Sequence, residues 1–165
     1  MSVVKFKDLG KIRIKHNKQK IVFCHGTFDL THVGHVLFLE SCKKLGDILV
    51  VAVADDKVTK SGKGNKRPIL NESIRLKMVD SLKPVDYCFL DIAKTTKDSL
   101  QVLARIFELL KPNIYAVNED SKDIPIRQKI TRQKGTKMFV LRRWSEKKFG
   151  KISTTSIVEK IRNLS

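Results

Sequence analysis

The sequence predicts a doubly wound α/β domain built on a mainly parallel, five-stranded sheet. Apolar runs of strand length alternate with segments of helical periodicity along the chain, and we find neither a repeat nor a linker. The 165 residues, 41% of them hydrophobic, are enough for one buried core but not for two. Strands joined through helices require right-handed crossovers, so we expect helices on both faces of the sheet.

The first βαβ unit begins at the first apolar run. Ile21–Cys24 is a short apolar run, and Asp47–Ala54 is a longer β-branched run that indicates a fully buried strand. Between them, apolar residues fall on one face of a helix over about 34–45, and Gly46 lies where a helix stop is expected. The next stretch, Asp55–Leu70, is basic and rich in glycine and proline, which predicts a loop.

The rest of the chain continues the alternation. The expected elements are, in order, a helix marked by Ile74, Met78 and Leu82, a strand over Tyr87–Leu90, a helix from Leu100 to Leu110 ended by Pro112, a strand over Ile114–Val117, a helix over about 125–134, a strand over Lys137–Leu141 and a terminal helix marked by Ile157, Ile161 and Leu164. We therefore expect one domain over 1–165, with a basic N-terminal extension over 1–19 and a C-terminal helix over 151–165.

Charge and composition limit the class of ligand. Subtracting 17 acidic from 34 basic residues gives a net charge of +17, which disfavours cationic substrates and favours phosphates, nucleic acid or anionic surfaces. No apolar run approaches the roughly 18 residues of a membrane span, and the start lacks the apolar centre of a signal peptide, so we expect a cytoplasmic protein. The three cysteines have no metal-site spacing and are interpreted as core residues.

Three of the four histidines lie in one turn, in the segment HGTFDLTHVGH at 25–35. In a doubly wound sheet the loops after the strands face one crevice, and this segment follows the first strand. Gly26 lets the backbone approach a ligand, and the helix N-terminus can hold phosphate oxygens. His32 and His35 are three residues apart, so they can point to the same side; alternatively, both only start the helix.

This segment resembles the HxGH signature of the cytidylyltransferase-like nucleotidyltransferase superfamily. The residues in register are His25, Gly26, Phe28, Asp29, His32, Gly34 and His35. Nearly the whole chain can be laid on that pattern, so the resemblance implies the Rossmann-like nucleotidyltransferase fold. It also implies transfer of a nucleoside monophosphate from a nucleoside triphosphate to a small sugar or polyol phosphate, with release of pyrophosphate.

Within the superfamily the chain most resembles the adenylyltransferase domains of ADP-heptose synthases, and next the glycerol-3-phosphate cytidylyltransferases. The matching residues are Lys63, Gly64, Arg67 and Pro68 of KGxxRP, the following Arg75, Val85–Tyr87 of VDY, and Ser153–Thr155 of STT. The usual glycine-rich motif after the fourth strand is replaced by Asn118–Ser121. Lys148 and Lys151 depart from the cytidylyltransferase form before STT. ATP is therefore favoured over CTP as the donor.

The resemblance implies roles for individual residues. The catalytic residues would be His32, His35 and Lys63. The nucleotide would be bound by Gly26, Thr27, Phe28, Asp29, His32, Gly34, His35, Asp120, Ser153, Thr154 and Thr155. The acceptor and phosphate groups would meet Lys63, Arg67 and Arg75. Mg²⁺ is the expected cofactor, with Asp29 and Asp120 as weak ligand candidates, and the expected partners are ATP or CTP and a phosphorylated sugar or polyol.

Other interpretations of the same residues are open. The charge would also suit a nucleic-acid-binding module, although the basic residues are spread along the chain, and the nucleotide motifs would suit a non-catalytic nucleotide sensor. Asp29 could only cap its turn, and the lysines over 57–67 could be a solvated surface rather than a lid over the donor. Arg142 and Arg143 beside Trp144 are interpreted as a docking or dimer surface, and we expect a homodimer without nucleic acid or membrane partners.

Overall fold

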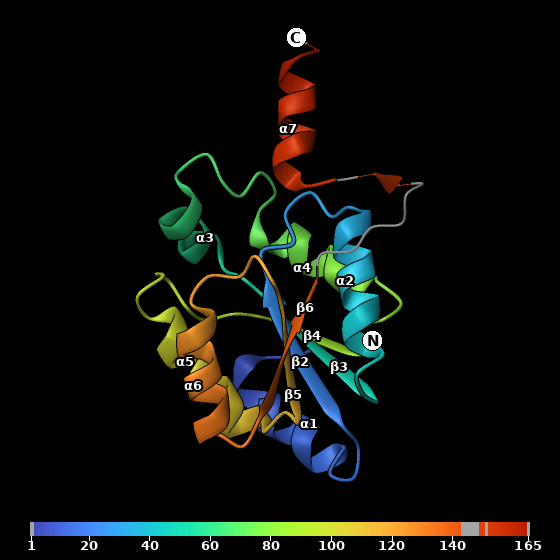
Figure 1. Cartoon of the computed structure of the whole chain (residues 1–165), viewed down its shortest axis with the longest axis vertical. Helices are drawn as coiled ribbons and strands as arrows, with labels where there is room; N and C mark the ends of the chain where they lie inside the picture. Colours follow the sequence, from blue (N-terminus) through green and yellow to red (C-terminus); the bar gives the residue numbers. More distant parts are fainter. Residues whose placement is uncertain (1, 143–148, 151, 165) are drawn as a thin grey trace.

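A computed structural model describes residues 2–142, 149–150 and 152–164, and it has a six-stranded sheet in the order β1-β4-β3-β2-β5-β6 (Figure 1). The strands are β1 (Ser2–Val3), β2 (Ile21–Gly26), β3 (Ile48–Val53), β4 (Tyr87–Leu90), β5 (Ile114–Asn118) and β6 (Lys137–Leu141). Every pairing between neighbouring strands is parallel. The predicted fold class is therefore confirmed.

Helices cover both faces of the sheet, as parallel strands require. They are the 3₁₀ helix η1 (Phe6–Asp8), α1 (Leu9–Lys15), α2 (Val33–Lys43), α3 (Asp56–Lys63), α4 (Glu72–Asp80), α5 (Ser99–Leu110), α6 (Ile124–Gln133) and α7 (Thr154–Arg162). Residues of α1 and α5 are buried in one core cluster, and residues of α2 and α4 are buried in the other. We call these the α5 face and the α2 face of the sheet.

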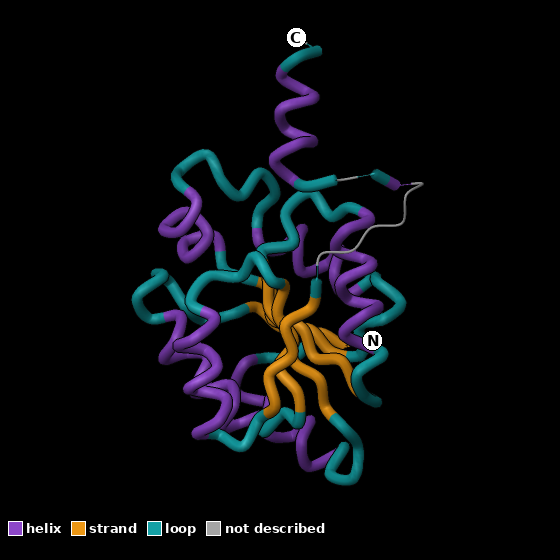
Figure 2. Tube along the Cα trace, viewed as in Figure 1, coloured by secondary structure: helices purple, strands orange, loops and turns teal. Residues whose placement is uncertain are grey.

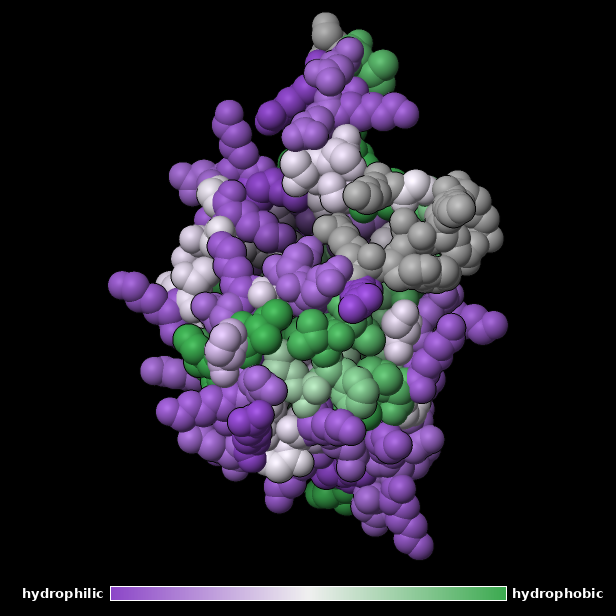
Figure 3. All heavy atoms as spheres, in the orientation of Figure 1, coloured by the Kyte–Doolittle hydropathy of each residue, from purple (hydrophilic) through white to green (hydrophobic). Residues whose placement is uncertain are grey.

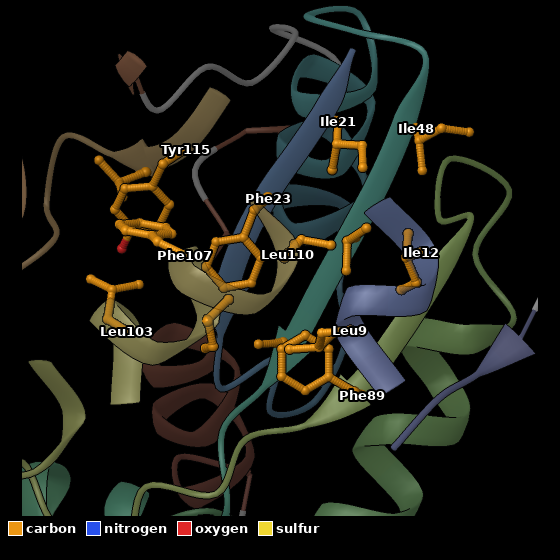
Figure 4. Close-up of a cluster of buried hydrophobic side chains, with 14 residues drawn as sticks. Leu9, Ile12, Ile21, Phe23, Ile48, Phe89, Leu103, Phe107, Leu110 and Tyr115 are labelled. Carbon is orange, nitrogen blue, oxygen red and sulfur yellow. The ribbon is translucent and has the colours of Figure 1, made fainter. Parts of the chain in front are cut away.

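The core of the α5 face is aromatic at its centre. The ring of Phe23 stacks on Phe89 on one side and on Tyr115 on the other, with centroids 6.3 and 5.6 Å apart, and Phe107 meets it edge-on at 6.0 Å (Figure 4). Side chains alternate between the two faces along a strand. Residues two positions beyond Phe23 on β2 and Phe89 on β4 therefore also lie on the α5 face.

The N-terminal segment is structured, although its sequence predicts no helix or strand. β1 pairs with β4, and Leu9 and Ile12 of α1 are buried in the core of the α5 face. A strand of two residues carries no periodic signal, and the apolar positions of α1 are separated by lysine, arginine and glycine.

The expectation of a loop over Asp55–Leu70 is wrong for its first half, where α3 forms. The Asp55 carboxylate caps this helix by accepting the Lys57 N–H at 2.7 Å, and Thr59 is buried. The loop prediction followed the lysines and glycines of this stretch. The Asp55 cap and the burial of Thr59 stabilise the helix, although its sequence has low helical propensity.

The topology places a crevice at the carboxyl ends of the central strands. From β2 the chain adds β3 and β4 on one side and later β5 and β6 on the other, so the order reverses between β2 and β5. In Figure 2 the loops gather at the end of the sheet nearest α7, which extends away from the rest of the chain. Hydrophilic side chains cover α3 and α7 on the face seen in Figure 3.

No helix in the described ranges is long and apolar enough to cross a membrane.

Candidate active site

A cleft of about 600 Å³ opens at this topological switch point, a volume in the range of small-molecule sites. Residues that follow β2, β3, β4, β5 and β6 line it, together with residues of α3 and the N-termini of α2 and α7. The predicted site residues that line it are Gly26, Thr27, Phe28, Asp29, His32, Gly34, His35, Lys63, Arg67, Asp120, Ser153, Thr154 and Thr155. Every predicted site residue except Arg75 is therefore brought to one cleft.

The two histidines of the HxGH motif form the N-terminal cap of α2. Nδ1 of His32 accepts the Gly34 N–H at 3.1 Å, and Nδ1 of His35 accepts the His32 N–H at 3.4 Å. The rings stack with centroids 4.0 Å apart. A side chain on Gly34 would put a Cβ 3.0 Å from the His32 ring, so the ring would have to move out of its present position.

These contacts determine which ring nitrogens can donate. A nitrogen that accepts a hydrogen bond carries no proton, so in the neutral imidazoles of His32 and His35 the proton is on Nε2. Both residues line the cleft. The motif therefore offers two N–H donors of the kind that bind phosphate oxygens.

The turn before α2 is conformationally strained. Phe28 and Leu30 have φ angles of 53° and 45°, in the left-handed region that residues other than glycine rarely adopt. Asp29 between them is buried, and its carboxylate accepts the N–H groups of Ile69 and Leu70 at 2.9 and 3.0 Å. These hydrogen bonds fix the end of the loop over 64–70 against the HxGH turn.

Two cations of the predicted lid lie beside this turn. Arg67 pairs with the Asp29 carboxylate at 3.4 Å. Desolvation and the nearby Arg67 guanidinium lower the pKa of Lys63, which lies at the end of α3. Grouped cations with few counter-ions favour an anionic ligand in this part of the cleft.

Arg75 is placed differently from the prediction that it binds the acceptor or a phosphate. It is fully buried under the cleft, where its guanidinium donates to the carbonyl oxygens of Leu70, Thr27 and Ala54 and to the Asp56 carboxylate. These partners belong to the HxGH turn, the end of β3, the start of α3 and the loop before α4. Arg75 thus holds together the segments that form the cleft.

The STT segment joins α7 to the motif. Ser153 caps α7 by accepting the Ser156 N–H at 3.0 Å, and the Thr154 hydroxyl donates to the Asp29 carbonyl oxygen at 2.9 Å. The N-terminus of α7 therefore faces the same cleft as that of α2, and both offer N–H groups to anions.

Several residues that line the cleft have no role predicted from the sequence. Among them are His25 at the end of β2, Asp91 after β4 and Arg127 on α6. Burial raises the pKa of Asp91. His25 was part of the motif but had no role, and α6 was recognised only as a charged helix, a pattern that does not indicate which arginine faces a cleft. Of the proposed docking residues, Arg142 lines the cleft, whereas Arg143 and Trp144 lie outside the described residues, as do Lys148 and Lys151.

The described residues include no cluster of three or more His, Cys, Asp or Glu side chains that could hold a metal ion. Asp29, one of the two candidate ligands, is engaged by Arg67 and by two backbone N–H groups. Asp120 is exposed and lines the cleft. The donor set therefore fits a cation that is held largely by a ligand's own oxygens, with the exposed Asp120 as a candidate protein ligand.

Comparison with known proteins supports the resemblance deduced from the motifs. A family model described as cytidylyltransferase-like matches residues 23–160. The bifunctional protein HldE of Desulfatibacillum aliphaticivorans is 32% identical over 151 residues, which are 91% of this chain and 28% of that protein. HldE of Helicobacter pylori strain G27 is 40% identical over 107 residues, 65% of this chain and 22% of that protein. The chain thus spans about a quarter of the length of these curated relatives.

Solved structures agree with the fold. The lipopolysaccharide core biosynthesis protein of Thermoplasma volcanium GSS1 superposes with a TM-score of 0.60 at 31% identity, over 78% of this chain and 98% of that one. Pantoate-beta-alanine ligase of Francisella tularensis superposes with a TM-score of 0.67 over 98% of this chain and 77% of that one. At 16% identity, this second likeness concerns the fold alone.

Proposed function

The chain belongs to the cytidylyltransferase-like family and is a nucleotidyltransferase, and from that premise we propose that it transfers a nucleoside monophosphate from ATP to a small sugar or polyol phosphate. The observation that carries the proposal is the convergence of three motifs on one cleft. HxGH, the lysine and arginine of KGxxRP, and STT are far apart in the sequence and line the same cavity.

In the proposed reaction a phosphate oxygen of the acceptor attacks the α-phosphorus of the donor. A new P–O bond forms, the bond from the α-phosphorus to the oxygen bridging it to the β-phosphorus breaks, and pyrophosphate leaves with that oxygen. Both reactants are anions, so the reaction needs positioned cations and hydrogen-bond donors more than it needs a covalent nucleophile.

The described contacts suit these requirements. Nε2–H of His32 and of His35 would donate to the phosphate oxygens on which charge increases in the transition state. The N-terminus of α7 would bind the β- and γ-phosphates, and Lys63 and Arg67 would close over the donor. Arg75 would keep these segments in register without touching substrate.

We also propose that Mg²⁺ accompanies the triphosphate. When bound, the ion would neutralise part of the charge on the phosphate oxygens. The triphosphate would supply most of its ligands, and Asp120 would be an exposed protein carboxylate of the cleft that can add one. The chain's own cations then balance the remaining charge.

Two similarities to known proteins support ATP as the donor and a sugar phosphate as the acceptor. The KGxxRP match to ADP-heptose synthases favours ATP, and CTP is the alternative donor. The likeness to a lipopolysaccharide core biosynthesis protein favours a sugar phosphate as the acceptor. A homodimer and a cytoplasmic location stay predictions from the sequence.

A screen of pyrophosphate release tests the proposal. ATP and CTP are each combined with heptose 1-phosphate and glycerol 3-phosphate in the presence of Mg²⁺, and we expect release that depends on the acceptor. His35→Ala should slow it about 100-fold, while His16→Ala, a change at a histidine outside the cleft, should not. Binding of ATP or CTP without turnover for any pair would instead indicate a nucleotide sensor.

A further inference from the structure

The cleft continues onto the face of the sheet opposite the HxGH helix. Phe23 and Phe89 belong to the core of the α5 face, and side chains two residues further along a strand point the same way, which places His25 and Asp91 on that face. The His25 ring stacks on Tyr115 with centroids 5.7 Å apart. Both His25 and Asp91 line the cleft.

Three side chains form a hydrogen-bonded group in this second half, in which His25 and Arg127 line the cleft and Tyr115 lies buried behind them. Nη1 of Arg127, from α6, donates to the Tyr115 hydroxyl at 2.7 Å and lies 3.2 Å from Nε2 of His25. Nδ1 of His25 lies 3.0 Å from the same hydroxyl. Nε of Arg127 donates to the Lys122 carbonyl oxygen at 2.9 Å, so the guanidinium is held from two directions.

The geometry determines the protonation of His25. A guanidinium can only donate, so Nε2 of His25 accepts, and the proton of the neutral ring is on Nδ1, from which it is donated to Tyr115. Burial and the adjacent Arg127 charge lower the pKa of His25 to about 3, so the ring is neutral at physiological pH.

These partners of Arg127 are therefore uncharged: the Tyr115 hydroxyl, the His25 ring and a backbone carbonyl oxygen. Among the described residues no carboxylate lies within ion-pair distance of Arg127, whereas Arg67 pairs with Asp29 and Arg75 pairs with Asp56. Arg127 is half-buried and lines the cleft. A fixed guanidinium with uncharged partners at a cleft wall is suited to an anionic ligand.

We propose that Arg127 binds the phosphate of the acceptor, with Tyr115 and His25 as the residues that position it. The inference rests on the proposed function, and it assigns the α5-face half of the cleft to the acceptor and the half near α2 and α7 to the triphosphate. The ligand class is a phosphate monoester, whose oxygens suit the planar fork of an arginine. The attacking oxygen would thus approach from one face of the sheet while pyrophosphate leaves toward the other.

The test compares substitutions on one helix. Arg127→Gln removes the charge and keeps a hydrogen-bond donor, and Arg132→Gln is the matched control at an exposed arginine of α6. We measure the KM of the acceptor that the wild type uses, its Kd by calorimetry, and the Kd of ATP with Mg²⁺. Arg127→Gln should raise the acceptor KM and Kd about 10-fold or more, as expected for loss of a charged hydrogen bond, and leave the ATP Kd within about 2-fold.

A second variant separates positioning from folding. Tyr115→Phe removes only the hydroxyl that holds Arg127, so it should raise the acceptor KM by a smaller factor than Arg127→Gln and leave the ATP Kd unchanged. Thermal unfolding of each variant identifies loss of the fold. If both variants fold and alter only acceptor binding, the roles are supported.

The same measurements distinguish a wrong acceptor subsite from a wrong proposed reaction. If Arg127→Gln weakens ATP instead of the acceptor, or weakens neither, the subsite is wrong although transfer proceeds. If the wild type binds a sugar phosphate through Arg127 but releases no pyrophosphate with any donor, the subsite stands and the proposed reaction is wrong. If the wild type binds neither heptose 1-phosphate nor glycerol 3-phosphate, the subsite is overturned.

Discussion

Arg75→Met tests whether this arginine holds the cleft together or binds substrate. Methionine fills similar space but donates no hydrogen bond, so the change removes four hydrogen bonds, at 2.9, 2.5, 2.7 and 2.6 Å. Three carbonyl oxygens and the Asp56 carboxylate would be left without this donor. Because the arginine is fully buried, water cannot replace it without a rearrangement of the segments above.

The magnitude follows from the chemistry of the lost contacts. Breaking a buried charged pair by removing one partner typically costs about 3–5 kcal/mol, and the partial exposure of Asp56 places the expected loss toward the lower value. For a domain of this size that loss lowers the melting temperature by roughly 6–20 °C. The expected loss is a large fraction of the roughly 5–15 kcal/mol that stabilises a typical domain.

The assay is unfolding by urea, followed by circular dichroism, for wild type, Arg75→Met and Lys77→Met. Lys77 is on the same helix with its side chain 76% exposed, so its substitution should change the free energy of unfolding by no more than about 0.5 kcal/mol. An Arg75→Met protein as stable as the wild type, but with an acceptor KM raised tenfold, would refute the reasoning. Arg75 would then act on a phosphate, as the family resemblance implied.

Three further predictions concern the motif, the lid and His25. Alanine at His32 or His35 should lower kcat about 100-fold with the fold retained, measured by pyrophosphate release and circular dichroism, and near-normal kcat would remove that histidine from the mechanism. Trypsin should cleave after Lys63 or Lys66, in the exposed stretch between the end of α3 and Arg67, faster in the free protein than with ATP and Mg²⁺, while cleavage at Lys18 is unaffected. Equal rates in both states would mean that these lysines are only a solvated surface. Because the folded-state pKa of His25 is lowered from 6.5 to about 3, the unfolded chain binds more protons in that interval, and the stability of the wild type should fall as pH drops through it. His25→Gln should show a shallower fall in urea unfolding measured across that range, and an identical slope would contradict the assignment.

Much of the sheet could be predicted because each strand after residue 20 is an apolar run with its own local signal. Tyr87–Leu90 and Lys137–Leu141 have the predicted bounds, and β2 and β5 end slightly later than predicted. β1 and α3 could not be predicted, because pairing with β4 and a cap by Asp55 stabilise them rather than sequence periodicity.

Site residues that lie close together in the sequence could likewise be predicted, whereas those brought together by tertiary contacts could not. The HxGH residues are close in sequence and form their own helix cap, so spacing alone indicated that His32 and His35 lie together. Arg127 contacts His25 and Tyr115 only because α6 packs against α5 and β6, and the contact with His25 joins residues more than a hundred positions apart. The motif also could not reveal that Arg75 is buried, since three of its four hydrogen-bond partners are backbone carbonyl groups.

The most direct test of the account is the fate of the phosphorus atoms of the donor. ATP labelled at the α-phosphorus or at the γ-phosphorus is incubated with Mg²⁺ and the acceptor found in the screen, and the products are separated by chromatography. Attack at the α-phosphorus predicts that the α label moves to the acceptor and the γ label appears in pyrophosphate. Transfer of the γ label to the acceptor, with release of ADP, would make the protein a kinase and contradict the account.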